Sequence, residues 1–112
     1  MATVLIADDE RVLREMLAEV VRDAGHRVVL AINGQQALDL VAQAPPDLII
    51  SDVMMPRLSG ADLCRRLKAS PATASIPIIL ISAASSAQGA PADAFLRKPV
   101  NLAELDAQLR RW

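Results

Sequence analysis

Acidic residues and one lysine stand at the ends of three apolar segments of this 112-residue chain. Asp8 and Asp9 follow the first of these segments, Asp52 ends a central one, and Lys98 follows the last. Carboxylates that are packed together repel one another, so a cluster of them favours a hard, oxygen-binding cation. If the segments meet in the fold, these residues would form a cation site with an ammonium group beside it.

The central segment predicts where Asp52 lies in the fold. Residues 47–52 form an apolar run rich in branched side chains, typical of a strand that is buried on both faces of a parallel sheet. Pro56 and Gly60 then interrupt regular structure. Asp52 is therefore expected at the carboxyl end of a strand, the edge where open α/β sheets bind their ligands.

Hydrophobic periodicity predicts the elements that position these residues. Apolar runs predict further strands, and the helix-like spacing of apolar side chains predicts four helices between and after the strands. Alternating strands and helices imply an α/β fold, a doubly wound five-stranded parallel sheet with helices on both faces. The expected strands are 4–7, 27–32, 47–52, 76–81 and 94–97; the expected helices are 10–24, about 34–44, one capped by Ser59 and one opened by Asn101.

The interval between the last two strands departs from this alternation. Residues 83–93 are small and weakly apolar, with Gly89 and Pro91 among them. An average helix takes about 11 residues, and the loops on either side need roughly 2 to 6 each. We therefore expect one or two helical turns at most, or an ordered loop, with high mobility in this interval. A strictly alternating fold would have five helices, so the fourth helix, between the last two strands, is expected to be shortened or missing.

Composition limits the function classes. A length of 112 residues is that of one domain, expected to span 1–112. The formal net charge is −1, and basic residues do not gather into a stripe, which argues against nucleic-acid binding. We expect no signal peptide and no membrane span. The one cysteine, Cys64, can form no internal disulfide, which is compatible with the expected cytoplasmic location.

Three sequence blocks, taken in order, resemble the receiver domain of response regulators in two-component signalling systems. The resemblance covers nearly the whole chain. Its specificity lies in the joint occurrence of blocks that each close a predicted strand, at the proper order and spacing. The blocks are VLIADDE at 4–10, DLIISDVMMP at 47–56 and KP at 98–99, with Ser82 before the last of them.

The resemblance implies a role for each residue at the strand ends. Asp52 would accept a phosphoryl group from a phosphohistidine. Asp9, the Asp52 side chain and the main-chain carbonyl of Met54 would bind Mg²⁺, with Asp8 acting mainly through water. Mg²⁺ keeps several waters and takes only one or two carboxylates directly, which suits this set.

The remaining implied roles concern the phosphoryl group and the switch. Ser82 would bind a phosphoryl oxygen and Lys98 would pair with the phosphoryl group. Ser82 and Phe95 would occupy the two switch positions. A cis peptide bond before Pro99 is also a family expectation. The separation of Ser82 from Lys98, 98 − 82 = 16 positions, is tighter than is usual in receivers.

Each residue also has a purely structural interpretation. Asp52 could cap a turn, and Asp8 and Asp9 could cap the helix that follows them. Lys98 could be a solvated surface residue, and Ser82 could satisfy a backbone group. Phe95 has no hydroxyl group with which to change contacts, so a core role is as compatible with its type as a switch role.

The predicted function is a phosphorylation-controlled signalling receiver that catalyses only its own phosphorylation and dephosphorylation, and is not an enzyme acting on other substrates. Its partners would be a sensor histidine kinase or histidine phosphotransferase and an unknown downstream protein, with no nucleic acid or membrane bound by this domain. It is either free-standing or excised from a longer protein.

Two alternatives stay open. One is a pseudo-receiver that binds proteins without phosphotransfer. The other is a phosphohydrolase with an aspartyl-phosphate intermediate, which the absence of an acid at Met54 disfavours.

Overall fold

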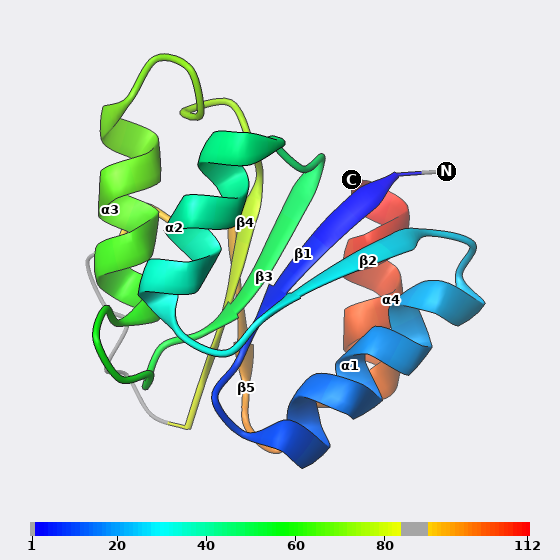
Figure 1. Cartoon of the computed structure of the whole chain (residues 1–112). Helices are drawn as coiled ribbons and strands as arrows, with labels where there is room; N and C mark the ends of the chain where they lie inside the picture. Colours follow the sequence, from blue (N-terminus) through cyan, green and yellow to red (C-terminus); the bar gives the residue numbers. More distant parts are fainter. Residues whose placement is uncertain (1, 84–89) are drawn as a thin grey trace.

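Five short strands of branched apolar residues form one parallel sheet in the order β2-β1-β3-β4-β5 (Figure 1). The computed structural model describes residues 2–83 and 90–112. The strands are β1 (Thr3–Ala7), β2 (Arg27–Ala31), β3 (Leu48–Asp52), β4 (Ile78–Ser82) and β5 (Ala94–Arg97), and the helices are α1 (Arg11–Asp23), α2 (Gly34–Gln43), α3 (Gly60–Ala69) and α4 (Leu102–Arg111).

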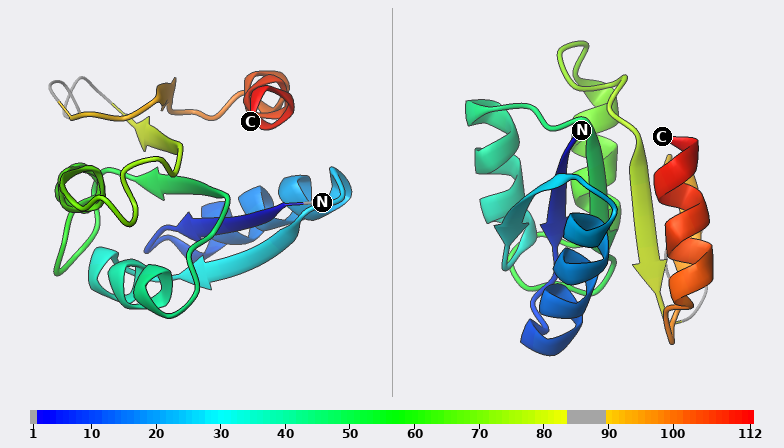
Figure 2. Two further views of the ribbon diagram at one scale, coloured as in Figure 1. Left: turned by 90° about the horizontal axis from the view of Figure 1, so that it is seen from above. Right: turned by 90° about the vertical axis from the view of Figure 1, so that its right-hand side faces the viewer.

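The helices cover both faces of the sheet, as Figures 1 and 2 show: α2 and α3 lie on one face, and α1 and α4 on the other. Alternate residues of each strand therefore enter different cores. Leu5 and Ile49 pack in the core under α2 and α3, whereas Ile6 and Ile50 pack in the core under α1 and α4. The central strands β3 and β4 are buried at every position. The predicted doubly wound sheet is confirmed.

Most of the predicted helix boundaries have the expected side-chain caps. The Asn33 side chain accepts a hydrogen bond from the Gln36 N–H at 2.7 Å, and Ser59 accepts one from the Asp62 N–H at 3.1 Å. Asn101 accepts from two N–H groups of the first turn of α4. The helix α1 begins differently, because its N-cap residue Glu10 makes no side-chain cap.

Two sequence expectations need correction. The strand β4 begins after Pro77, since proline has no N–H to donate to a neighbouring strand. The leucine spacing of the last predicted helix places Leu102 on its apolar side, together with Leu105 and Leu109. Leu102 is instead 47% exposed, because it is the first residue of α4, and only the other two leucines are buried in the core.

The chain between β4 and β5 contains no helix among the residues that the structure describes there, Ala83 and 90–93. The prediction for residues 84–89 lies outside the described residues. The four helices α1 to α4 lie elsewhere in the chain. They fit a receiver-like fold in which the additional helix expected between β4 and β5 is shortened. None of the described helices has the length and apolar character to span a membrane.

Candidate functional site

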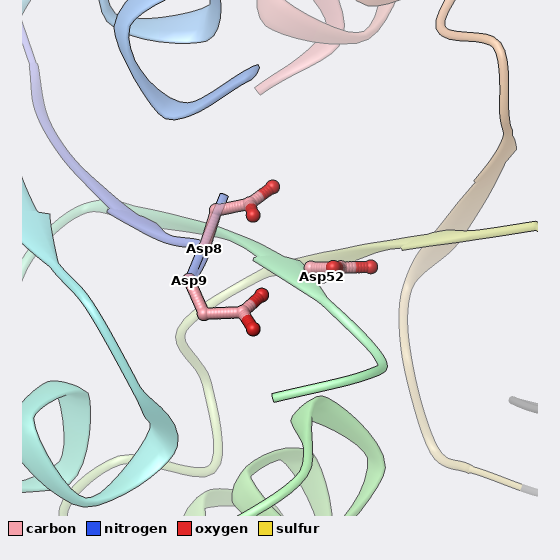
Figure 3. A group of neighbouring side chains, drawn as sticks. All are labelled: Asp8, Asp9 and Asp52. Carbon is pink, nitrogen blue, oxygen red and sulfur yellow. The ribbon is translucent and has the colours of Figure 1, made fainter. Parts of the chain in front are cut away.

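Three carboxylates meet at the carboxyl edge of the sheet. One carboxylate oxygen from each of Asp8, Asp9 and Asp52 lies within 4.8 Å of the others. Figure 3 shows Asp8 and Asp9 leaving the end of β1 beside Asp52 at the end of β3. The sequence interpretation placed these acids together, and the structure does bring them together.

Strand register accounts for this meeting. Ala7 pairs with Ser51 in the parallel ladder between β1 and β3, so Asp8 and Asp52, the next residues, leave the sheet side by side. Lys98 reaches the same edge because Arg97 pairs with Ser82 in the ladder between β4 and β5. The Lys98 N–H also donates to the Ser82 carbonyl at 2.9 Å.

Lys98 and Asp52 form an ion pair at the centre of the site. The Lys98 Nζ lies 3.2 Å from Asp52 Oδ2, and the Asp52 side chain is only 4% exposed. Burial by itself lowers the pKa of the Lys98 ammonium, but the hydrogen bond and charge of Asp52, with the charges of Asp8 and Glu10, raise it above its usual value. Lys98 is thus held as a cation against a buried carboxylate.

The carboxyl group of Asp8 has a raised pKa. Burial raises the pKa of its carboxyl group from 3.8 to about 6, against the lowering effect of the Glu10 N–H, which donates to Asp8 Oδ1 at 2.8 Å. The negative charges of Asp52 and Asp9 add to the increase. The prediction that Asp8 caps α1 is wrong in detail, since its partner is the N–H of the N-cap residue itself and not one of the first turn.

The residues present fit a hard divalent cation. Asp8 Oδ2 is buried and has no hydrogen-bond partner within the described part of the chain, although it lies in a cluster of like charge. A buried polar atom of this kind needs a partner. All three side chains offer oxygen atoms, which suit Mg²⁺ rather than softer metals.

The other predicted site residues lie around this cluster. Ser82 is buried at the end of β4, with 6% of its surface exposed. Met54 lies two residues after the end of β3, and its side chain is exposed; the expected role of its main-chain carbonyl stays a prediction. The Lys98-Pro99 peptide bond is cis, as the family resemblance implied.

Phe95 does not fill the core, which corrects that part of the sequence interpretation. Its side chain is 50% exposed. The reason is its place on β5, which is an edge strand of the sheet. In this strand Leu96 is buried, whereas the residues on either side of it, Phe95 and Arg97, are exposed.

Three residues that support the site were missed in the sequence. The Arg14 side chain donates to the main-chain carbonyl of Asp8 at 2.9 Å, and the Ser51 hydroxyl donates to the carbonyl of Asp52 at 2.9 Å. Gly60 allows α3 to approach β3, because a Cβ atom there would lie 2.1 Å from the Asp52 carbonyl oxygen. Only the glycine gave a signal in the sequence, as a residue that begins a helix directly after a turn.

The sequence comparisons with known proteins all point to one family. The sequence profile of the response regulator receiver domain matches residues 4–110. The response regulator MprA of Mycolicibacterium vanbaalenii is 40% identical over 113 residues, a match that covers 96% of this chain and 48% of that protein. The chain thus spans about half the length of the curated relatives that it matches.

Solved structures show the same fold. The signal receiver domain of a signal transduction histidine kinase from Syntrophus aciditrophicus has a TM-score of 0.95 and 32% identity, covering 99% of this chain and 89% of that one. The receiver domain of the sensor histidine kinase PA1611 from Pseudomonas aeruginosa has a TM-score of 0.90 and 30% identity, covering 99% and 96%. That receiver domain was solved with a magnesium ion coordinated in its active site cleft.

Proposed function

Because this chain belongs to the family of response regulator receiver domains of two-component systems, we propose that Asp52 accepts a phosphoryl group from a phosphohistidine of a partner protein. The observation that carries the proposal is the contact between Asp52 and Lys98, 3.2 Å apart within a cluster of three carboxylates. A buried carboxylate beside other acids and one ammonium group suits phosphoryl transfer, which depends on positioning and charge neutralisation.

The chemistry of this transfer assigns a task to each residue. An ionised oxygen of Asp52 attacks phosphorus; the new O–P bond forms as the N–P bond to the donor imidazole breaks, and that nitrogen keeps the bonding electron pair. Lys98 pairs with a phosphoryl oxygen, and the Ser82 hydroxyl donates to another. The product is an acyl phosphate, which hydrolyses readily and suits a signal that must decay.

The acidic cluster is proposed to hold Mg²⁺. Asp9, Asp52 and the Met54 carbonyl would bind the ion directly, while Asp8 would act mainly through water. When bound, the ion neutralises negative charge that three carboxylates and an incoming phosphoryl group would otherwise oppose.

The same residues suggest how phosphorylation is read out. Ser82 ends β4, and Phe95 lies in the adjacent strand with half of its side chain exposed. A phosphoryl group bound by Ser82 would change the position of this strand end, and the exposed Phe95 would change its contacts with a partner. We therefore propose Ser82 and Phe95 as the switch residues.

The proposed partners follow from this chemistry. The phosphodonor is a sensor histidine kinase or a histidine phosphotransferase, and the target is a downstream protein in the cytoplasm. The domain itself, taken as residues 1–112, is proposed to bind no nucleic acid and to act on no external substrate.

Intact-protein mass spectrometry tests the proposal. The chain is incubated with Mg²⁺ and a small acyl phosphate donor, with Asp52→Asn as the negative control and Asp106→Asn, an exposed acid of α4, as the matched control. We expect a phosphate adduct in the unmodified chain and in Asp106→Asn but none in Asp52→Asn. No adduct in the unmodified chain would indicate a pseudo-receiver, and turnover of phosphate esters would indicate a hydrolase.

A further inference from the structure

The peptide group between Asp8 and Asp9 is hydrogen-bonded by a side chain of the helix that follows it. Arg14 lies in the first turns of α1, and its Nη1 donates to the Asp8 carbonyl oxygen at 2.9 Å in a partly buried contact. The peptide unit is planar, so fixing this carbonyl also fixes the N–H of Asp9. The hydrogen bond from Arg14 thus restrains the backbone that carries the side chains of both Asp8 and Asp9.

The other polar atoms of Asp8 are anchored as well. Its N–H donates to the Ala31 carbonyl at 3.1 Å, and its Oδ1 accepts from the Glu10 N–H at 2.8 Å. Of the Asp8 atoms, only Oδ2 is buried and without a hydrogen-bond partner in the described chain, and the Asp8 side chain belongs to the carboxylate cluster. Three polar groups of Asp8, its N–H, its carbonyl and Oδ1, therefore each have a hydrogen-bond partner that holds the residue in place.

We infer that Arg14 is a positioning residue of the metal site, which holds the Asp8–Asp9 peptide so that both carboxylates face Asp52. This inference rests on the proposed function, because it concerns the acids that are proposed to hold Mg²⁺. Arg14 touches neither the ion nor the phosphoryl group. It acts through the loop that carries two of the acids.

Charge and position predict opposite effects when Arg14 is removed. Its positive charge repels a divalent cation, so charge alone predicts tighter Mg²⁺ binding without it. Its hydrogen bond orients the acids, so positioning predicts weaker binding. Loss of an outer partner that orients metal ligands typically weakens metal affinity 10- to 100-fold. The direction of the change therefore distinguishes the two effects.

In the experiment, Mg²⁺ is titrated into the full chain, and binding is monitored by the amide resonances in NMR spectra. Arg14→Met keeps an unbranched apolar stem but removes the donor, and we expect it to bind Mg²⁺ about 10-fold more weakly. Arg14→Lys retains a donor on a long stem and is expected to regain most of the affinity. The Asp9 amide resonance, which belongs to the restrained peptide, should shift in the Met variant before any Mg²⁺ is added.

Arg11→Met is the matched control. Arg11 lies in the same helix, and its removal changes the net charge equally, but its guanidinium pairs with Glu15 at 3.3 Å on the exposed surface. We expect its Mg²⁺ affinity to stay within about twofold of the unmodified chain, since exposed pairs contribute little. A urea denaturation of each metal-free variant verifies that it is folded.

Unchanged or tighter binding in Arg14→Met would overturn the inference, and so would equal weakening in Arg11→Met. Should Arg14→Met fail to fold, Arg14→Gln makes the same comparison, because its shorter neutral side chain does not span the distance to the Asp8 carbonyl. Failure of the unmodified chain to bind Mg²⁺ would instead contradict the proposed function, and that measurement comes first.

Discussion

Asp8 shows how the burial of a single acidic residue can oppose folding. Its carboxyl group is fully buried, and its pKa rises from 3.8 to about 6. Below both values the group is protonated in the folded and unfolded chains and does not affect the free energy of unfolding. Between them the folded chain holds the proton more tightly, so the folded state loses stability as the pH rises from about 4 to about 6.

Asp8→Asn should therefore stabilise the protein in the presence of a chelator. The rise from 3.8 to about 6, at 1.36 kcal/mol per pKa unit, corresponds to about 3 kcal/mol, so the free energy of unfolding should increase by about that amount at pH 7 and change little near pH 4. Urea denaturation at both pH values measures this difference. Glu15→Gln, an exposed acid of α1, is the control and should show no such gain. A lower free energy of unfolding for Asp8→Asn than for the unmodified chain at pH 7 would contradict the inference that ionised, buried Asp8 destabilises the folded state.

At the scale of elements, two helix starts hold the backbone that follows Asp52. A Cβ atom at Gly60 would lie 2.1 Å from the Asp52 carbonyl oxygen, and one at Gly34 would lie 2.0 Å from the Leu58 carbonyl oxygen. The loop between β3 and α3 is therefore in direct contact with the backbone of α2 as well as α3. These contacts require the absence of a side chain rather than an unusual backbone angle.

Gly34→Ala tests this contact. Alanine is the better helix former by about 1 kcal/mol, so local propensity predicts a more stable protein. The clash with Leu58 predicts the opposite, and overpacking costs about 1 to 3 kcal/mol. We expect a net loss of up to about 2 kcal/mol in the free energy of unfolding, measured by urea denaturation. The comparison is Gly25→Ala, where no atom lies within 4 Å and only the backbone angle of +93° is strained. A gain in stability for Gly34→Ala would contradict the close approach.

The elements themselves could be predicted because their signals are local. Asn33 and Ser59 stand at helix starts, and the apolar runs mark the strands; the structure confirms both kinds of signal. What local patterns could not predict depends on contacts between segments. Phe95 is exposed because β5 lies at the edge of the sheet, and Arg14 reaches Asp8 only once α1 has packed beside β1. The strand-end acids could be predicted because parallel strands share one carboxyl edge.

For the whole molecule, the site joins parts of the chain that are far apart in sequence. Asp9, Asp52 and Lys98 come from the ends of β1, β3 and β5, and the unfolded chain does not bring them together. A ligand that binds only the folded arrangement stabilises the whole domain by mass action. Ion binding should therefore raise the free energy of unfolding of the whole domain, in addition to any local change at the site.

Mg²⁺ should raise the free energy of unfolding by about 2.7 kcal/mol at a concentration 100-fold above its dissociation constant. Asp9→Asn should abolish most of this increase, while Asp106→Asn, an exposed acid on α4, should retain it. Urea denaturation with and without Mg²⁺ gives the comparison. An equal effect of Mg²⁺ on the unmodified chain and on Asp9→Asn would show that the ion acts elsewhere.

The central claim is that one oxygen of Asp52 forms the bond to phosphorus, and locating that bond tests the claim most directly. An acyl phosphate can be reduced by borohydride, which leaves an alcohol at the residue that carried the phosphoryl group. After incubation with Mg²⁺ and the acyl phosphate donor, reduction and peptide sequencing by mass spectrometry should find this mark at Asp52 alone. A mark at Asp8, Asp9 or any other residue, with Asp52 unmodified, would contradict the account.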